Sequence, residues 1–381
     1  MSPEIPLALA VDRYSKLKLR PTVAVVTTEE RTEFFRSDIR TSLSLKIHPE
    51  ISPLLFSLDG LKTVEEWMEY EELKESNLTS ILELFSLLKR ERILIEVDRI
   101  YPESYLRHKR VYAFLENYAS STSQVIQAFD RLSSSRVLII GLGAVGTWVA
   151  QSLMMSGVRN FTLVDPDLVE LSNLHRQIGF GYRDVGCPKV DAFRDYLWTK
   201  DHTLDIEIIK DVLDEGFFDR HPVAVDLIIN CADHPTVDET SRIVGDYAMA
   251  HGIAHCVGGG YNLHQTLVGQ IIIPGETACV ECFRMELEEL NVIDTSNITR
   301  LDNPKRKIGS FPPLSALSAS ITSNEAFKFL SGIGHYCMAN NRTEFTLREM
   351  NFMTIPFKRR QDCIYCGTEG KYYQLPGDTN P

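Results

Sequence analysis

Short apolar runs alternate with segments of helical periodicity over residues 136–381. The runs have the length of buried strands and lie at residues 137–140, 161–164, 206–209, 226–230 and 253–257. This alternation is typical of a mostly parallel, Rossmann-like sheet wrapped by crossover helices. Residues 270–274 and 344–357 look instead like antiparallel additions. The pattern therefore predicts an α/β fold for this part of the chain.

Residues 1–100 have a different pattern, which predicts a small α+β module with a winged-helix-like fold. The expected strands lie at residues 16–27, 41–47, 54–58 and 93–97. A turn at Asp59-Gly60, a helix begun by Thr63 and a helix over 78–88 lie between the last two of them. Residues 101–135 would form a linker and a dimer-crossing helical segment, followed by the sheet domain at 136–381. The simplest role for such a module is dimerisation or packing.

Composition and charge exclude several classes of function. The chain has 381 residues, 44% of them hydrophobic, and no apolar run as long as a membrane helix. Because the N-terminal residues lack the features of a secretory signal, a cytoplasmic location is expected. The formal net charge of -12 argues against a nucleic-acid partner. Basic clusters at 107–110, 305–307 and 358–360 are most simply solvated surface.

The eight cysteines indicate thiols or metal ligands rather than disulfides. Four of them form two separated C-x-x-C pairs, Cys279, Cys282, Cys363 and Cys366. Two such pairs supply four thiolates for a tetrahedral zinc ion, which leaves no open coordination position and so predicts a structural site. Unrelated surface pairs or a redox dithiol are the alternatives. The remaining cysteines are expected to be small core residues, Cys187, Cys231, Cys256 and Cys337.

A glycine-rich turn follows the first apolar run of the sheet domain. Gly141, Gly143 and Gly146 have the G-x-G-x-x-G spacing, whose backbone N–H groups suit any phosphate. Asp165 and then Asp167 follow the second apolar run, where a carboxylate can bind ribose hydroxyls. At this point both NAD and ATP remain possible.

Polar residues downstream of this carboxylate favour ATP. Asn173, Arg176, Gln177 and Lys189 supply amides and cations, which suit a triphosphate, whereas a nicotinamide needs an apolar slot and a proton donor. Asp233 follows the apolar run at 226–230, where its hard oxygen atoms suit a magnesium ion that bridges phosphates.

Over residues 107–367 the chain resembles the ThiF-like adenylating enzymes, which are relatives of the ubiquitin-activating enzymes. The resemblance rests on ordered motifs, GLGAVG, LVDPDLVELSNLHRQ, DVGCPK, CADHP, TACVEC and CIYC. It implies that Asp165 binds ribose and that Asp233 binds magnesium. It also implies phosphate ligands at Asn173, Arg176, Gln177 and Lys189.

The family carries an R-x-x-R motif before its glycine turn, and residues 107–110 of this chain, RHKR, are similar to it. The resemblance implies that Arg110 crosses a dimer interface to the partner's ATP, and therefore that the protein is a homodimer. The chemistry implied is attack of a substrate carboxylate on the α-phosphorus of ATP. Arg110, Arg176, Lys189 and the magnesium ion at Asp233 would then neutralise the charge that develops on pyrophosphate.

The segment after the first C-x-x-C pair limits the reactions that can follow adenylation. Ubiquitin activators pass the acyl group to a cysteine there, but residues 283–320 contain none. A thioester step at that position is therefore excluded. Two kinds of enzyme remain, which activate sulfur-carrier proteins or mature peptide antibiotics.

The N-terminal module favours peptide maturation. Its pattern resembles the recognition elements of enzymes that modify ribosomally made peptides, including those of the microcin C and pantocin A kind. Such modules bind a leader peptide as an added strand at an open sheet edge, with a helix as the other wall of the groove. The sequence thus suggests adenylation of a precursor peptide, followed by cyclisation with loss of AMP or by retention of AMP. Activation of a diglycine-ending sulfur carrier, a non-catalytic peptide-binding scaffold and an NAD oxidoreductase are the alternatives.

Overall fold

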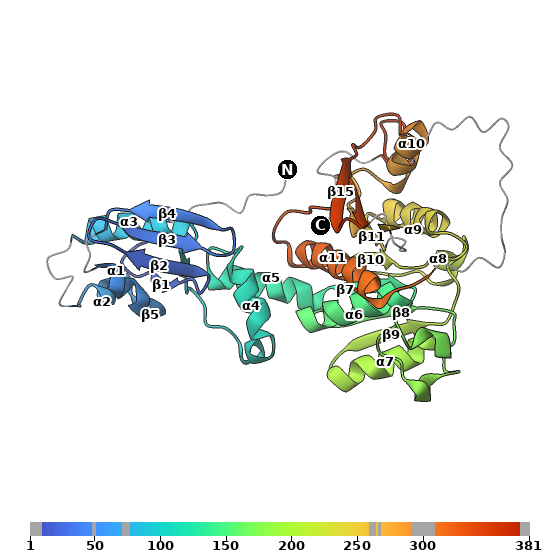
Figure 1. The fold of residues 1–381 in the computed structure, drawn as a ribbon, viewed down its shortest axis with the longest axis horizontal. Helices are drawn as coiled ribbons and strands as arrows, with labels where there is room; N and C mark the ends of the chain where they lie inside the picture. The colour runs from blue at the N-terminus through green and yellow to red at the C-terminus, as the bar shows by residue number, and fades with distance from the viewer. Residues whose placement is uncertain are drawn as a thin grey trace. The chain divides into compact units, whose positions relative to one another are not determined.

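The computed structural model describes residues 10–47, 51–70, 77–258, 264–265, 268–290 and 309–373. The chain divides into two compact units, Met1–Asp130 and Arg131–Pro381 (Figure 1). Helix α5, Thr122–Ser134, contains the boundary between them. The basic cluster at 305–307 lies outside the described residues. Among the helices that are described, none combines the length and the apolar character needed to span a bilayer.

The second unit is built on a six-stranded sheet with the order β13-β11-β10-β7-β8-β9. Its parallel strands are β7 Arg136–Ile140, β8 Asn160–Val164, β9 Asp205–Ile209, β10 Leu227–Asn230 and β11 Ala254–Val257. Strand β13, Gln270–Ile272, pairs antiparallel with β11. The predicted α/β fold is confirmed.

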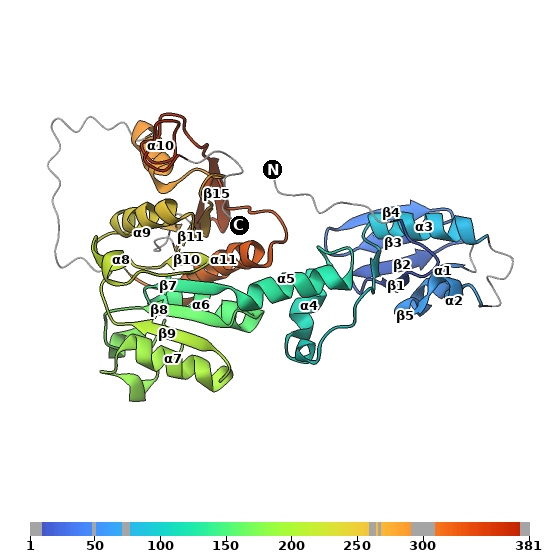
Figure 2. The same ribbon diagram turned by 180° about the vertical axis from the view of Figure 1, so that it is seen from behind.

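Helices connect these strands and cover the sheet. They are α6 Ala144–Ser156, α7 Lys189–Lys200, α8 Phe217–Arg220, α9 Val237–His251, α10 Val280–Leu290 and α11 Pro312–Ser331. Because the chain moves in opposite directions along the sheet from β7 to β8 and from β10 to β11, right-handed crossovers place α6 and α9 on opposite faces. Helix α11 lies against α6, as both views show (Figure 1, Figure 2).

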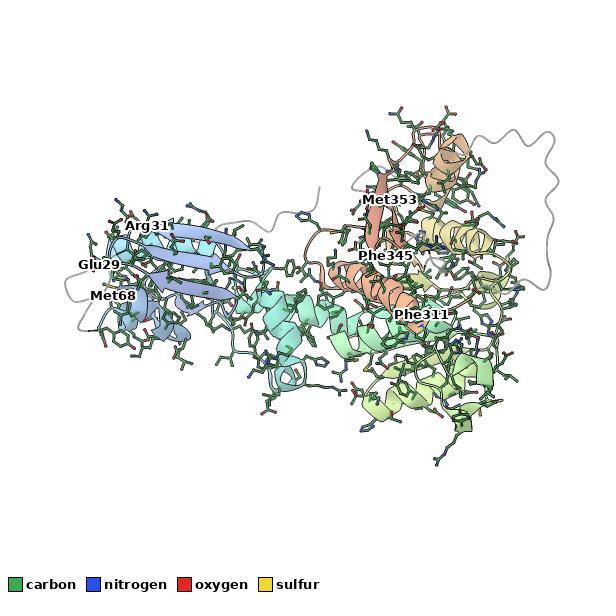
Figure 3. All side chains as sticks on the ribbon, in the orientation of Figure 1. Glu29, Arg31, Met68, Phe311, Phe345 and Met353 are labelled. Atoms are coloured by element: carbon green, nitrogen blue, oxygen red, sulfur yellow. The ribbon has the colours of Figure 1, made fainter. Side chains whose placement is uncertain are left out.

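The remaining strands of the second unit are antiparallel. Strands β14, Asn341–Thr346, and β15, Asn351–Pro356, form a hairpin, and β12, His264–Gln265, pairs with β14. The expected antiparallel segment at 344–357 is therefore two strands and a turn. Phe345 packs against Phe352 with ring centroids 4.8 Å apart, and Met353 lies on β15 (Figure 3).

The first unit has two three-stranded antiparallel sheets, β5-β1-β6 and β2-β3-β4. The strands are β1 Lys16–Leu19, β2 Val23–Thr27, β3 Thr32–Arg36, β4 Thr41–Leu45, β5 Asp59–Thr63 and β6 Leu94–Glu96. The helices are α1 Ile51–Leu54, α2 Val64–Trp67, α3 Leu78–Arg90 and α4 Lys109–Glu116. The predicted small α+β architecture is confirmed, whereas its winged-helix character stays a prediction.

The helix predicted to begin after Thr63 does begin there, and the predicted helix over 78–88 is α3. Thr63 forms a capping box with Glu66 at the start of α2. Helix α3 buries Ile81, Phe85 and Leu88 in the core of the unit, which confirms the helical spacing of these apolar residues.

Several expectations for the strands of the first unit are wrong. Asp59-Gly60 is not a turn but the start of β5, where Gly60 has φ +83° and the pairing with β1 shifts register. A glycine signal can mark a bulge as well as a turn. The strand expected at 54–58 is instead the end of α1 followed by the 3-10 helix η1, Leu55–Ser57. A brief apolar run in the sequence does not distinguish a helix from a strand. The strand expected at 16–27 is two strands, and β3 was not predicted.

Candidate active site

The glycine turn joins β7 to α6 and has little room at two of its three glycines. Gly141 has φ +90°, and a Cβ there would lie 2.8 Å from backbone atoms of Cys231 and Ala232. A Cβ at Gly146 would lie 1.9 Å from the carbonyl oxygen of Gly141. A Cβ at Gly143 would have no heavy atom within 4 Å. The outer glycines are therefore required by packing, whereas the middle one leaves space for a phosphate to approach the backbone.

The turn lies where the strand order of the sheet reverses. Strands β7 and β8 lead toward one edge, and β10, on the other side of β7, leads toward the opposite edge. In open α/β sheets, ligands bind outside the carboxyl ends of the strands at this switch point. The loops after β7, β8 and β10 all begin at the carboxyl ends of these parallel strands. These loops carry most of the predicted site residues.

Asp165, Asp167 and Lys189 form one cluster after β8. The buried carboxylate of Asp165 accepts hydrogen bonds from the backbone N–H groups of Leu142 at 2.6 Å and Asp167 at 2.9 Å. The Lys189 ammonium lies 3.6 Å from Asp165 and 2.7 Å from Asp167. Burial raises the pKa of Asp165, which the nearby Lys189 opposes. The structure thus joins the glycine turn, the predicted ribose carboxylate and a predicted phosphate ligand.

Backbone pairing holds Lys189 in this cluster. The Val169 N–H donates to the Cys187 carbonyl at 2.8 Å, and the Lys189 N–H donates to the Asp167 carbonyl at 2.9 Å. The start of α7 is therefore fixed to the segment that follows β8.

Asn173, Arg176 and Gln177 lie on one turn after this cluster. The Asn173 carbonyl accepts the N–H groups of Arg176 and Gln177 at 3.1 and 3.0 Å. The Gln177 side chain is buried, and neither its Oε1 atom nor the Arg176 Nε atom has a hydrogen-bond partner in the described part of the chain. Since buried polar groups are rarely left unpaired, both atoms are suited to a ligand.

Asp233 is exposed on the loop after β10, and two buried residues fix this loop. Asn230 Oδ1 accepts the Ala232 N–H at 3.1 Å, and Thr240 Oγ1 donates to the Ala232 carbonyl at 2.9 Å. Asn230 Nδ2 also donates to Thr240 at 3.1 Å. Asn230 and Thr240 could not be identified from the sequence, because buried polar residues of this kind carry no motif that separates them from other polar residues.

Arg110 lies on α4 in the first unit, where it is exposed. The other predicted nucleotide ligands all belong to the second unit. The catalytic role of Arg110 stays a prediction.

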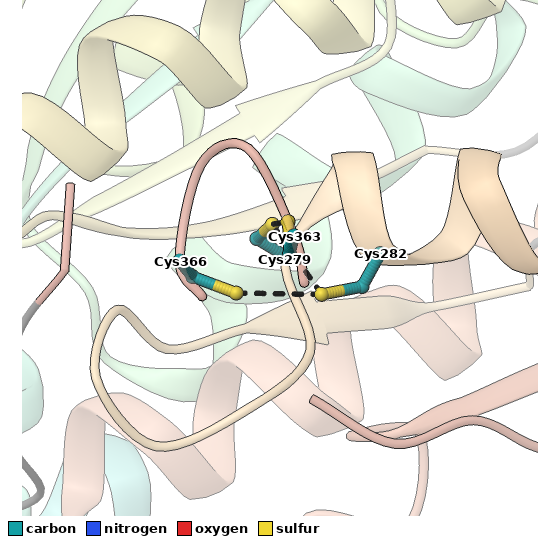
Figure 4. Close-up of side chains that lie close together, drawn as sticks. All are labelled: Cys279, Cys282, Cys363 and Cys366. Atoms are coloured by element: carbon teal, nitrogen blue, oxygen red, sulfur yellow. Dashed lines mark hydrogen bonds between the residues drawn. The ribbon is translucent and has the colours of Figure 1, made fainter. Parts of the chain in front are cut away.

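The four cysteines of the two C-x-x-C pairs come together at the start of α10 and near the C-terminus (Figure 4). Their sulfur atoms all lie within 4.8 Å of one another, and all four residues are buried. Three Sγ–Sγ distances are 3.8, 3.6 and 3.3 Å. Four thiolates at about 2.3 Å from a zinc ion would lie about 3.8 Å apart, so this group fits a tetrahedral metal.

The other cysteines do not all lie in the core as expected. Cys256 is buried, Cys231 is half-buried, and Cys187 and Cys337 are exposed. Burial, with the charge of Asp233, raises the pKa of Cys231 to about 12. Cys231 is therefore held as a neutral thiol beside the glycine turn.

Comparison with known proteins identifies the family. The model of the ThiF family matches residues 118–366, which is more than half of the chain. The chain belongs to the ThiF family. A relative is the molybdopterin-synthase adenylyltransferase of Escherichia coli, which is 27% identical over 248 residues, 64% of this chain and 93% of that protein. The prediction of an ATP-dependent adenylating enzyme is confirmed.

Solved structures of similar fold cover both units of this ThiF family member. Escherichia coli MccB, solved with ATP, has a TM-score of 0.70 and 20% identity, covering 92% of this chain and 99% of MccB. Another MccB structure is that of the microcin C7 biosynthetic enzyme in complex with N-formylated MccA. PaaA has a TM-score of 0.67 and 19% identity, covering 88% of this chain and 99% of PaaA.

Substitutions of Gly146 and Gly143 separate the role of the turn in packing from its role in ATP binding. Gly146→Ala is expected to destabilise the fold by about 1–3 kcal/mol, because its Cβ would overlap the Gly141 carbonyl. Gly143→Ala is expected to keep the unfolding temperature of the wild type and to weaken ATP binding, since the added methyl group occupies only the space open to a phosphate. Thermal unfolding and calorimetric ATP titration separate the two effects. Unchanged ATP affinity in Gly143→Ala would place the phosphates elsewhere.

Proposed function

We propose that this protein is a homodimeric peptide-maturation enzyme, which captures a precursor peptide through its first unit and adenylates a carboxylate of that peptide. The observation that supports this most is the extent of the similarity. The fold of MccB matches 92% of the chain, whereas the sulfur-carrier and molybdopterin adenylyltransferases match by sequence over no more than 65% of it. The N-terminal unit is therefore the feature that separates this enzyme from a sulfur-carrier activator.

The second unit would bind ATP and magnesium. Asp165 would bind the ribose, and the glycine turn, with Asp167, would border the nucleotide. Phosphate ligands would be Asn173, Arg176, Gln177 and Lys189. Asp233 would hold magnesium, which supplies positive charge to the phosphates.

The reaction would begin with attack of a peptide carboxylate oxygen on the α-phosphorus of ATP. The bond from that phosphorus to the β-phosphate oxygen breaks, and pyrophosphate leaves with the electron pair. Arg176, Lys189 and Arg110 of the partner subunit would stabilise the charge that develops on it. A nucleophile within the peptide then displaces AMP from the acyl adenylate, so that the peptide closes a ring with a net loss of water. Retention of AMP on the peptide is the alternative outcome.

The first unit offers an open sheet edge for the leader peptide. Strand β4 pairs only with β3 among the described strands, so its other side is free for an added strand. Its residues Leu43 and Leu45 pack against the same core as Phe85 of α3. The edge of β4 and the helix α3 would therefore form the two walls of a peptide groove.

Hydrogen exchange of the full chain tests this groove. Addition of a candidate precursor peptide, chosen from short open reading frames that adjoin the gene, is expected to slow exchange of the β4 amides at residues 41–45. The other edge strand of the same sheet, β2, serves as the internal control and should be unaffected. A functional groove should have a dissociation constant of about 1 µM, so about 100 µM peptide should saturate it. Absence of any protection at that concentration would contradict the proposal that this protein binds a precursor peptide.

Activation of a sulfur-carrier protein is the second candidate, because adenylyltransferases of such proteins are among the sequence relatives. It would require pyrophosphate release with a small diglycine-ending protein as substrate. Such release, in the absence of release with the peptide, would favour this candidate.

The cysteine group would hold a structural zinc ion that joins the C-terminal residues to α10. Purified protein is expected to contain about one zinc per chain. Cys363→Ser should lower the unfolding temperature and leave direct contacts to ATP in place. The exposed Cys337 provides the control, since Cys337→Ser should keep the zinc and the stability. A never-chelated preparation without zinc would contradict this assignment.

A further inference from the structure

A buried carboxylate lies at the C-terminal end of α4, the helix that carries Arg110. Glu116 is 3% exposed. Its Oε1 atom accepts hydrogen bonds from the Lys18 ammonium at 2.8 Å and from the Tyr101 hydroxyl at 2.7 Å. Lys18 lies on β1, the central strand of the sheet β5-β1-β6. One side chain therefore joins a helix to a strand that is about a hundred residues earlier in the chain.

Arginines from the same sheet region bind carbonyl groups at the end of this helix and just after it. The buried Arg20 donates to the carbonyls of Glu116 and Ala119, the second at 2.6 Å. Arg92 donates to the Asn117 carbonyl at 3.2 Å. These carbonyls have no partner within a helix, and cations are favoured at a helix C-terminus. Every bond in this group lies within the first unit.

Aromatic packing orients the rest of α4 around the same group. Tyr101 stacks on Tyr105 with centroids 4.7 Å apart and meets Tyr112 of α4 edge-on at 5.0 Å. Tyr112 in turn packs against Phe129 of α5 at 4.6 Å. Aromatic contacts tolerate small sliding movements better than charged hydrogen bonds. The directional links between α4 and the sheet region are therefore the Glu116 carboxylate and the arginine bonds to the backbone carbonyls.

We infer that Glu116 is a positioning residue, which locks α4 onto β1 so that the peptide-recognition unit carries Arg110 as part of a single body. This inference rests on the proposed function, in which the first unit binds the peptide and Arg110 binds the phosphates of the partner's ATP. Because α4 is fixed to β1, Arg110 would move together with the unit that binds the peptide.

Substitutions of Lys18 test the lock in the full chain. Lys18→Met removes one of the two donors to Glu116 and keeps most of the aliphatic stem. It is expected to speed exchange of the α4 amides and to lower kcat for pyrophosphate release about 10- to 100-fold, the usual cost of a misplaced catalytic group. The KM for ATP and the affinity for the candidate precursor peptide should stay within about twofold of the wild type, because neither site is altered. Lys18→Arg should restore most of kcat.

The control is Lys16→Met, which removes an exposed lysine from the same strand and should leave every readout unchanged. If Lys18→Met does not fold, Tyr101→Phe removes the other donor while retaining the aromatic stack. Unchanged exchange of the α4 amides would overturn the lock whatever the peptide does. A loss of peptide affinity that accompanies the loss of kcat would also overturn the lock, because such a result would indicate general disruption of the first unit. A wild-type enzyme without peptide-dependent pyrophosphate release would instead contradict the proposed function, and the exchange result would still decide the lock.

Discussion

Asp233→Ala is expected to abolish pyrophosphate release, with a loss of about 1000-fold or more, while the protein remains folded. The expectation follows from the position of this side chain, which is exposed on the loop after β10, where the preceding residues Cys231 and Ala232 contact the glycine turn. Its loss would remove the carboxylate proposed to hold magnesium on the phosphates. The loop itself should persist, because Asn230 and Thr240 fix its backbone. Pyrophosphate release with saturating ATP and peptide measures the effect.

Asp238→Ala is the matched control for this substitution. Asp238 is also exposed and lies five positions later, in the first turn of α9. Its replacement should change the unfolding temperature slightly and the turnover hardly at all. Wild-type turnover in Asp233→Ala would show that magnesium is held by other residues.

Arg110→Ala is expected to lower turnover to a similar extent, by about 1000-fold, which is typical of an arginine supplied to a transferring phosphate group. Arg110 is exposed on α4, so its removal should not affect the core of the first unit. Replacement of its exposed neighbour, Lys109→Ala, should have little effect. Equal losses in the two variants would indicate only a general requirement for positive charge.

Mixing the two inactive variants tests whether Arg110 acts across a dimer interface. A heterodimer of Arg110→Ala and Asp233→Ala chains would contain one site with both residues intact, one from each subunit. Recovery of a substantial fraction of the wild-type turnover is expected. If heterodimers are shown to form and remain inactive, Arg110 acts in the site of its own subunit or in no site.

The sheet domain could be predicted in detail because all of its strands except β9 are largely buried. Leu138, Ile139 and Ile140 are all fully or almost fully buried, so β7 is a continuous apolar run in the sequence. The strands of the first unit are short and half-exposed, and their patterns are ambiguous. Gly60, for example, marks a bulge in β5 rather than a turn, and only the pairing with β1 distinguishes the two.

The site could be predicted as far as motifs mark it. The glycine spacing and Asp165 are local signals, and the structure brings them into contact through the Leu142 N–H. Residues that act through tertiary contacts carry no such signal. Glu116 and Lys18 are far apart in the sequence, and each alone is an ordinary charged residue in an amphipathic segment. The expected division at residues 100 and 135 stays a prediction, whereas the compact units of the structure meet after Asp130.

Mass spectrometry of the candidate precursor peptide, incubated with the enzyme, ATP and magnesium, decides whether this protein matures a peptide. Peptide maturation predicts release of pyrophosphate together with a change in peptide mass, either the loss of one water with free AMP or the gain of an adenylate group. The change should be absent with Asp233→Ala and present with Asp238→Ala. A peptide of unchanged mass, with no pyrophosphate released by an enzyme that binds ATP, would contradict the account.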